Sequence, residues 1–256
     1  MRRLGAWSVG GVATAVAALI LASSAASPGG AATAVRGGVT TAAPGGATPA
    51  ATRTAALAVG RLQYEGGGDW YANPSSLPNL IAAIRARTTI AVAPNELRLR
   101  LSDARLWDVG FLHATGHGNL RFSDEELERL RSWLASGGFL HLDDNYGFDE
   151  SVRRELARLY PDRPLVTVAR THPIYHAVYD LPDGLPKIHE HDGKPPEGLG
   201  IFLGERLAVF YSYESDLGNG WEDPGTHPND PPEKHEAALR MGVNLFVYAV
   251  TSRPVS

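Results

Sequence analysis

One stretch decides the fold: residues 111–147 read FLHATGHGNLRFSDEELERLRSWLASGGFLHLDDNYG. An apolar run ends at a Gly-His-Gly loop, a capped helix follows and stops at a glycine, and a second apolar run leads into an acidic loop. This pattern is typical of two buried parallel strands joined by a helix. Because parallel strands place their carboxyl ends at one edge of the sheet, His117 should lie near Asp143 and Asp144. Open α/β folds bind their ligands at that edge.

The rest of the globular part continues the alternation of strands and helices. Apolar runs predict strands over residues 57–64, 89–92, 97–101, 109–115, 138–142 and 165–168. Helical spacing predicts helices over residues 76–87 with Ser76 as the cap, 123–137, 148–160 and 233–250. We therefore expect a three-layer, doubly wound α/β fold with a mostly parallel sheet. Its C-terminal elaboration is a hairpin at residues 200–211 and two long loops, 172–200 and 215–232, which should close over the site.

The N-terminal segment differs in composition, since residues 1–53 contain no Asp or Glu. Residues 1–26 combine a basic start, an apolar run and small residues, which is typical of a cleaved signal peptide. The uncharged residues 4–22 also have nearly the length of a membrane anchor, and this alternative stays open. Residues 27–53 predict a disordered Ala/Gly/Pro/Thr linker, and residues 54–256 the folded domain. We expect the domain to be exported: periplasmic, extracellular or tethered to the outer face of the membrane.

The folded domain is acidic. Four of the 24 basic residues precede position 54, which leaves 20 Lys and Arg against 28 Asp and Glu, a formal charge of −8. This charge, without a basic run, argues against nucleic acid as a partner and against membrane contact by the folded domain. The chain has no Cys, so disulfide and thiolate chemistry are excluded. The sequence has no G-x-S-x-G elbow and no phosphate-binding glycine loop, and no organic cofactor is evident.

Three polar loops follow predicted strands: residues 65–71, 116–119 and 143–147. If the strands are parallel, all three loops open at one edge. The two glycines around His117 let the backbone approach a ligand closely. Alternatively the turn is structural, and the imidazole bonds a neighbouring loop. The candidate ligand-binding residues in and beside these loops are Tyr64, Gly67, Asp69, Trp70, Gly116, Gly118, Asn119, Asn145 and Tyr146.

Asp143 and Asp144 are adjacent, so in an extended segment their side chains point to opposite sides. A carboxylate directed into the sheet edge needs a partner such as His117, His141 or a backbone donor. Such a carboxylate can serve as general base, nucleophile or metal ligand. The candidate catalytic residues are therefore Asp143, Asp144 and His117. The alternative for Asp144 is that it caps the following helix.

The loop at residues 187–193 has a spacing typical of a metal site. His189 and His191 lie on one side of an extended segment, where both imidazoles can reach one divalent ion. The sequence identifies no third ligand, and structural hydrogen bonds are the alternative. Carboxylates and aromatic residues in the same region suit a sugar or a cationic ligand, or they hold the loops to the domain. These further candidates are Glu190, Tyr213, Glu214, Asp216 and Trp221.

Five motifs resemble the family called domain of unknown function 4159, over about residues 59–251. They are RLQYEGGGDWYANP (61–74), TGHGNLRFSDEELERLRSWLASGGFL (115–140), LDDNYG (142–147), HPIYHAVYDLPDGLPKIHEHDG (172–193) and FYSYESDLGNGWED (210–223). The resemblance implies a class I glutamine amidotransferase-like (flavodoxin-like) fold, in the superfamily that includes the ThuA-like proteins. It implies no established reaction. Family members often lie in MoxR ATPase and von Willebrand A-type gene neighbourhoods, which implies an accessory role in the cell envelope.

In catalytic amidotransferases of that superfamily, the elbow carries a Cys backed by a His. Here the corresponding positions are Asp143, Asp144 and Asn145, so the resemblance implies a site without thiol chemistry. We therefore expect an exported module that binds a small polar or carbohydrate-like ligand or a cell-envelope partner. The alternative is a hydrolase with Asp143 or Asp144 as general base, assisted by a metal on His189 and His191. A purely structural envelope module is the third hypothesis.

Overall fold

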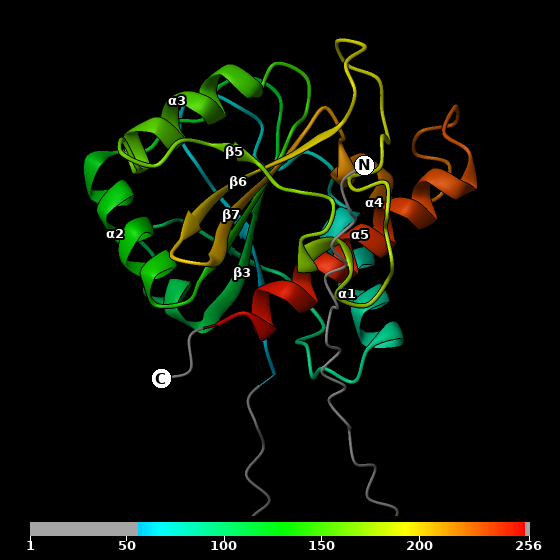
Figure 1. Cartoon of the computed structure of the whole chain (residues 1–256), viewed down its shortest axis with the longest axis horizontal. Coiled ribbons are helices and arrows are strands. Elements are labelled where there is room, and N and C mark those ends of the chain that lie inside the picture. The colour runs from blue at the N-terminus through cyan, green and yellow to red at the C-terminus, as the bar shows by residue number, and fades with distance from the viewer. Residues whose placement is uncertain (1–55, 254–256) are drawn as a thin grey trace, which may run out of the picture. The chain divides into compact units, whose positions relative to one another are not determined.

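A computed structural model describes residues 56–253 (Figure 1). The predicted signal peptide, membrane anchor and linker lie outside the described residues. The described chain forms a seven-stranded sheet in the order β2-β1-β3-β4-β7-β6-β5. Its strands are β1 (Ala58–Leu62), β2 (Leu97–Leu99), β3 (Val109–Ala114), β4 (Phe139–Asp143), β5 (Val166–Thr167), β6 (Glu197–Leu203) and β7 (Arg206–Tyr213).

The sheet is mostly parallel, as predicted. β1 pairs in parallel with β2 and β3, and β4 pairs in parallel with β3 and β7. β6 is antiparallel to both of its neighbours, β7 and β5, because it forms the predicted hairpin with β7. The parallel arrangement brings the carboxyl ends of β1, β3, β4 and β7 to one edge, where the polar loops begin.

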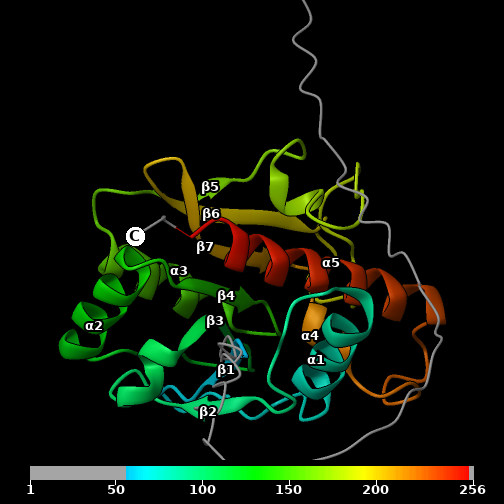
Figure 2. The ribbon, with the colours of Figure 1, turned by 90° about the horizontal axis from the view of Figure 1, so that it is seen from below.

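Helices cover both faces of the sheet (Figure 1 and Figure 2). One face is covered by α2 (Asp124–Ala135) and α3 (Asp149–Leu159), which share an apolar core with the strands. The other face is covered by α1 (Ser76–Arg87), α4 (Leu217–Trp221) and α5 (Pro232–Thr251) over a second core. Two 3-10 turns, η1 (Ala104–Asp108) and η2 (Pro173–Tyr175), lie in connecting segments. These layers confirm a mixed α/β fold. No helix within residues 56–253 is long and apolar enough to cross a membrane.

The unit predicted from residues 111–147 is formed by β3, α2 and β4. The Ser123 hydroxyl accepts a hydrogen bond from the backbone of Glu126, whose carboxylate accepts one from the backbone of Ser123. This is the predicted capping box, and it starts the helix. Gly137 follows the helix with a φ of +105°, a conformation that favours glycine. The local chemistry thus makes β3 and β4 parallel neighbours and aligns the loops that follow them.

Two local predictions are wrong. Residues 89–92 form only an isolated bridge between Val92 and Leu57, because β2 pairs with β1 through Leu97 instead. Ser76 does not cap α1, since Ser75 is the N-cap and Ser76 already lies in the first turn. The Ser76 hydroxyl donates to the carbonyl oxygen of Asn73 instead.

The two segments predicted as long loops contain regular structure. Residues 172–200 include η2 and the start of β6, and residues 215–232 include α4. α4 begins because the Asp216 carboxylate accepts a hydrogen bond from the backbone of Asn219. The burial of Ile174 and Leu217 in the core holds both segments to the domain.

Candidate functional site

The carboxyl edge of the sheet carries a polar cavity of about 550 Å³. Its walls come from the loops after β1, β3, β4 and β7 and from the 187–193 loop. The residues that line it are Ala72, Asn73, His117, Asn145, Tyr146, His189, Glu190, His191, Asn219, Glu222 and His227. The predicted convergence of loops at this edge is therefore present, and the volume is within the ordinary range for small-molecule sites.

Four histidines line this cavity, and each has a carboxylate beside one ring nitrogen. The nitrogen–oxygen distances are 2.9 Å for His117 with Asp69, 3.7 Å for His189 with Asp230, 3.1 Å for His191 with Asp216 and 3.0 Å for His227 with Glu222. At hydrogen-bond distance, as for His117, His191 and His227, the carboxylate orients the ring and selects the tautomer; Asp230 is too far from His189 to do so. The second nitrogen of each ring then remains for a ligand, a metal or a proton transfer.

Asn145 provides an unpaired donor at the cavity wall. The residue is 2% exposed, and its side-chain oxygen accepts from the backbone N–H of Tyr146. Its amide nitrogen Nδ2 has no hydrogen-bond partner among residues 56–253. A buried amide without an acceptor costs about 1–3 kcal/mol, so an acceptor oxygen of a ligand would stabilise it. The Tyr146 ring is 64% exposed and stands at the rim.

The Asp143 carboxylate is used within the fold. It is fully buried and accepts hydrogen bonds from the Ser212 hydroxyl and from the backbone N–H groups of Leu217 and Gly218. Burial, and secondarily the nearby Asp216 carboxylate, raise the pKa of Asp143 to about 8 in spite of these donors. Asp143 therefore links β4 to the start of α4. The sequence predicted that a buried carboxylate here needs a partner such as a backbone donor, and the N–H groups of Leu217 and Gly218 provide it.

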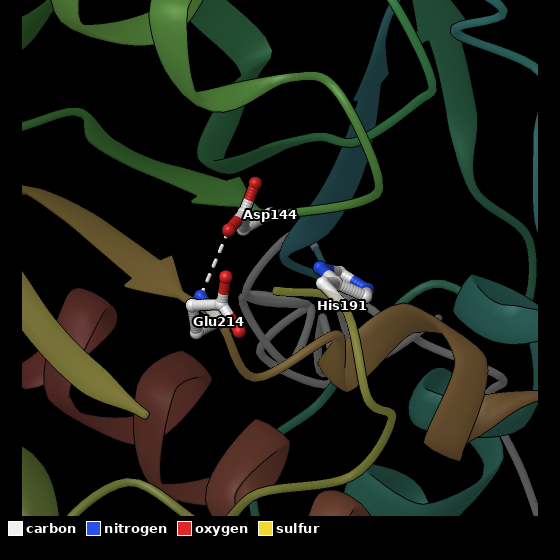
Figure 3. A group of neighbouring side chains, drawn as sticks. All are labelled: Asp144, His191 and Glu214. Atoms are coloured by element: carbon white, nitrogen blue, oxygen red, sulfur yellow. Dashed lines mark hydrogen bonds between the residues drawn. The ribbon is translucent and has the colours of Figure 1, made fainter. Parts of the chain in front are cut away.

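The Asp144 side chain lies on the other side of the strand, at a second cavity of about 260 Å³. Its oxygen Oδ2 accepts a hydrogen bond from the backbone N–H of Glu214 at 2.8 Å (Figure 3). Burial raises the pKa of Asp144 to about 6. Asp144 does not cap the next helix, because the N-cap of α3 is Phe148, which makes no side-chain cap bond. Of the two adjacent acids, Asp144 is therefore the one that a ligand can reach.

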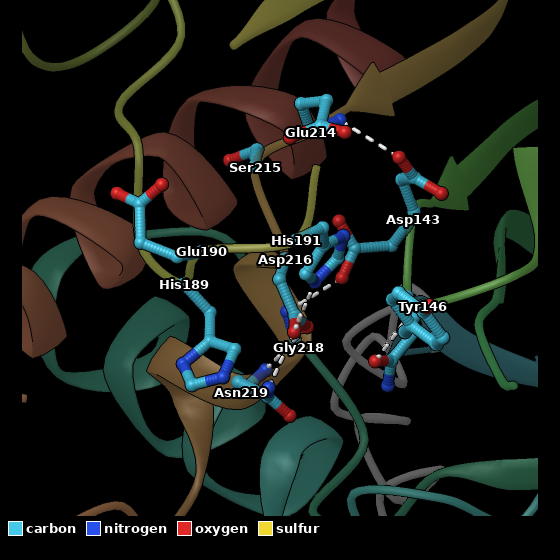
Figure 4. Close-up of polar contacts among 12 residues, drawn as sticks. Asp143, Tyr146, His189, Glu190, His191, Glu214, Ser215, Asp216, Gly218 and Asn219 are labelled. Atoms are coloured by element: carbon cyan, nitrogen blue, oxygen red, sulfur yellow. Dashed lines mark hydrogen bonds and ion pairs between the residues drawn. The ribbon is translucent and has the colours of Figure 1, made fainter. Parts of the chain in front are cut away.

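The segment after β7 carries two strained, buried acids. Glu214 and Asp216 have φ angles of +56° and +60°, values uncommon for residues with a side chain. Glu214 pairs with the Lys187 ammonium at 2.8 Å, and Asp216 bonds His191 and Asn219 (Figure 4). Burial, the largest single effect, would raise the pKa of Glu214, but the hydrogen bond and charge of Lys187, the backbone N–H of Asp192 and the charge of His191 together outweigh it, and the pKa is lowered. The strained backbone at Glu214 and Asp216 directs both carboxylates toward the carboxyl edge of the sheet.

A buried chain of hydrogen bonds runs beneath the site to Asp143. His113 Nδ1 lies 3.0 Å from His141 Nδ1, and His141 Nε2 lies 2.9 Å from the Ser212 hydroxyl. When the Ser212 hydroxyl donates to Asp143 or to the carbonyl oxygen of Leu142, it accepts from His141, which then carries its proton on Nε2, while His113 carries its proton on Nδ1. The remaining nitrogen, Nε2 of His113, is the buried atom without a partner in the described part of the chain. Trp221 packs over both imidazoles, with ring centroids 5.2 and 5.7 Å away.

Both buried histidines should stay neutral in mildly acidic solution. Burial lowers the pKa of His141 to about 3 and that of His113 well below its usual value. In nitrogen NMR spectra we expect neither ring to titrate between pH 8 and 5. His176, whose pKa is raised by the Arg170 carbonyl and by Asp180, should titrate over that range. An imidazolium signal from His113 or His141 above pH 5 would contradict the neutral state expected for these rings.

The same shifts determine a contribution to stability. The unfolded chain binds protons at these histidines below a pKa of about 6.5, whereas the folded chain does not. Their stabilising contribution is therefore present above about pH 6.5 and is lost as the pH falls toward the lowered pKa of each folded ring, about 3 for His141, by up to roughly 1.36 kcal/mol per pH unit for each ring.

Comparison with known proteins assigns the chain to a family. The model of the family described as Domain of unknown function (DUF4159) matches residues 58–250. The chain belongs to this family. No curated protein matches the chain. The match covers every strand and all the loops that form the two cavities, so the site just described lies entirely inside the DUF4159 domain.

Of the predicted residues in the first two loops, some hold other side chains in place and one, His117, lines the larger cavity. Tyr64 is buried and donates to the carbonyl of Thr115. Asp69 holds His117 through both the ring and the backbone N–H. The other residues lie outside the wall of the larger cavity: Trp70 packs on the core, Gly67 has open space around it, Gly116 lies against Tyr64, Gly118 adjoins Gly68, and Asn119 bonds the Gly66 carbonyl and Arg154.

The predicted residues near β7 have separate positions. Trp221 is fully buried, and its indole N–H donates to the carbonyl of Ala238, which leaves no surface for a ligand to contact. Tyr213 lines the smaller cavity and carries Arg153 and Lys194 over its ring. Glu190 lines the larger one. The alternative interpretation, in which aromatic residues hold the loop to the domain, describes Trp221.

The structure groups the potential metal ligands differently from the sequence-based pairing of His189 with His191. In residues 56–253, one group of side chains has three ligand atoms within 4.8 Å of one another, and its members are Asp144, His191 and Glu214. His189 is not among them; its ring centroid lies 6.1 Å from that of His191 and 5.9 Å from that of His227.

Four polar residues that line the larger cavity were not predicted from the sequence: Asn73, Asn219, Glu222 and His227. Asn73 follows the predicted 65–71 loop, and the others lie in the segment 215–232. A long polar segment that contains His227 and Trp221 was the available signal. Which of its side chains face the cavity depends on α4, which the sequence pattern did not indicate.

Proposed function

We propose that the larger cavity binds a small, uncharged, polar ligand of the carbohydrate kind. The observation that carries this proposal is the unpaired Asn145 amide in a wall of carboxylate-oriented histidines. Amides and imidazoles supply both donors and acceptors, as closely spaced hydroxyl groups require. The exposed Tyr146 ring offers an apolar face at the rim, which suits the C–H face of a sugar ring.

The charge of the wall supports an uncharged ligand. The lining residues include no Lys or Arg within the described chain, so a phosphate or carboxylate ligand would lack the permanently charged partner that anion sites commonly have. The two acids of the wall also have partners: Glu222 bonds His227 at 3.0 Å, and Glu190 lies 3.8 Å from the Lys187 ammonium. We therefore rank neutral sugars above sugar acids and sugar phosphates.

The test is a thermal-shift screen of the full chain against neutral oligosaccharides, sugar phosphates, sugar acids and polyamines. Neutral sugars should raise the unfolding midpoint, since a ligand that binds only the folded state stabilises it. A response limited to the anionic compounds would contradict the proposal.

Tyr146→Ala should weaken binding of the best neutral sugar by about tenfold or more, corresponding to about 1.4 kcal/mol. The matched control is Tyr71→Ala, because Tyr71 is also 64% exposed but lies outside the cavity wall. Calorimetric titration of both variants measures the difference. Equal affinities in the two variants would place the ligand elsewhere.

The second candidate is a hydrolase in which Asp144 is the general base. The specific observation is that Asp144 faces a cavity and has a pKa raised to about 6, near the value useful for a base at neutral pH. Asp143 is less suited, since both of its oxygens accept hydrogen bonds from the fold. Turnover on a panel of glycosides and esters that is abolished in Asp144→Asn would support it; turnover unaffected by that change would exclude Asp144 as the base.

The wider context is also part of the proposal. We place the domain in the class I glutamine amidotransferase-like superfamily, near the ThuA-like proteins, as a member without a thiol nucleophile. The signal-like N-terminus supports export, and a cell-envelope protein is then a candidate partner besides the small ligand. Fractionation of cells that express the full chain tests the export, because an uncleaved chain found only in the cytoplasm would exclude it.

A further inference from the structure

Three side chains from distant parts of the sequence meet beside the larger cavity. Asp144 follows β4, Glu214 follows β7, and His191 extends from the loop between them (Figure 3). One ligand atom of each lies within 4.8 Å of those of the other two. Their side chains are nearly inaccessible, at 5% exposure for His191 and 1% for Glu214, and Asp144 as a residue is 3% exposed.

Each of the three groups is oriented by a neighbour. Asp216 holds His191 Nε2 at 3.1 Å, and Nδ1 has no hydrogen-bond partner within the part of the chain that the structure describes. Lys187 holds Glu214, and the backbone N–H of Glu214 holds Asp144. Hydrogen bonds of this kind from outside the ligand set fix ligand orientation in metal sites, with a carboxylate on the far nitrogen of a histidine as the commonest form.

The local charge is unbalanced. The carboxylates of Asp144, Glu214 and Asp216 are buried here, against the single ammonium group of Lys187. Buried carboxylates require neutralisation by a cation or a proton. With Asp143 protonated at neutral pH, in line with its pKa of about 8, and His191 neutral, as a metal-binding imidazole is, an excess of two negative charges matches one divalent ion.

We propose that Asp144, His191 and Glu214 bind one divalent transition-metal ion of the Zn²⁺ or Mn²⁺ kind. An imidazole with two carboxylates suits these ions better than Ca²⁺ or Mg²⁺, which prefer oxygen ligands alone. Around one tetrahedral zinc ion with bonds of about 2.0–2.2 Å, ligand atoms lie roughly 3.3–3.6 Å apart, so separations of up to 4.8 Å must shorten by about 1 Å. Small side-chain movements from the present positions therefore suffice. Three protein ligands leave a position open to water, as in catalytic zinc sites.

The proposal does not depend on the sugar ligand, so metal alone is the probe. Untagged full chain is stripped with a chelator, dialysed and titrated with Zn²⁺ and with Mn²⁺ against a competing chromophoric chelator. The expected result is one ion per chain, with Mg²⁺ and Ca²⁺ binding far more weakly. Absence of stoichiometric Zn²⁺ or Mn²⁺, or preference for Mg²⁺, would overturn the proposal.

Variants locate the site. His191→Gln and Asp144→Asn should each weaken Zn²⁺ binding by more than about 100-fold, because loss of an outer partner alone costs 10–100-fold. Asp216→Asn should fall in that smaller range. The matched control is His189→Gln, two positions from His191 and 44% exposed, whose affinity should stay within about threefold. Circular dichroism of the stripped proteins shows which variants are folded. Whichever of His191→Gln and Asp144→Asn is folded then provides the test of the ligand set. Equal losses in the variants of His189 and His191 would overturn the ligand set.

Discussion

Arg61→Met is expected to destabilise the domain by about 3–5 kcal/mol, the usual result of breaking a buried charge network. Arg61 is 1% exposed in the middle of β1. Its guanidinium pairs with Glu96 at 3.0 Å and donates to the carbonyl oxygens of Ala72 and Asn73. Methionine fills a similar volume but leaves the Ala72 carbonyl without its donor and the Glu96 carboxylate with Arg98 alone, whereas Asn73 keeps Ser76 as a donor. Since Ala72 and Asn73 line the larger cavity, ligand binding should weaken as well.

Arg98→Met is the matched control for Arg61. Arg98 pairs with the same carboxylate at 2.7 Å, but its side chain is 55% exposed, so its loss should cost under about 1 kcal/mol. Urea unfolding of both variants measures the free energies. In a thermal scan, the change at Arg61 should appear as a fall of roughly 10 °C in the midpoint. Similar values for the two variants would show that burial of Arg61 is not the source of its stabilisation.

Gly116→Ala should have the second largest effect, with a loss of about 2–3 kcal/mol from strain and overpacking. Gly116 has a φ of +150°, and an added Cβ would overlap the Tyr64 hydroxyl and come within 3.0 Å of the Asp69 carboxylate. Asp69 is the residue that holds His117 at the cavity wall. The substitution should therefore lower stability and ligand affinity together.

Gly118→Ala is the control within the same Gly-His-Gly turn. Its φ is +84°, yet the nearest atom to an added Cβ is 3.9 Å away. Only the conformational cost of about 1 kcal/mol remains. Chemical denaturation separates the two variants, and a loss at Gly118 as large as that at Gly116 would contradict the importance of the Tyr64 contact.

The sequence was sufficient for the parts of the fold that local chemistry determines. The capping box of Ser123 and Glu126, the glycine stop at Gly137 and two apolar runs specify β3-α2-β4 without reference to the rest of the chain. Parallel pairing then brings His117 and Asp144 to one edge, because strand direction alone decides where the loops open. The alternation of elements likewise predicted a mostly parallel sheet with helices.

The site itself depended on contacts that no local pattern records. Asp143 and Asp144 are adjacent in sequence, but only the position of α4 determines that Asp143 is enclosed and Asp144 faces a cavity. His191 was paired with His189 because they are close in sequence. The co-ligands with which it could hold a metal, Asp144 and Glu214, follow strands that the sheet order makes neighbours. Trp221 was predicted to bind a ligand, because aromatic residues beside acids often bind sugars. In the structure it packs over the buried histidines instead.

The central claim is that the larger cavity binds a neutral polar ligand through the unpaired Asn145 amide. The most direct measurement is a proton–nitrogen correlation spectrum of the full chain, titrated with neutral oligosaccharides, with the Asn145 side-chain signals assigned through Asn145→Ser. We predict a saturable shift of those two amide proton signals, and weaker binding in the variant. Saturable binding that leaves the Asn145 amide signals unchanged, or no binding of any neutral sugar, would contradict the account.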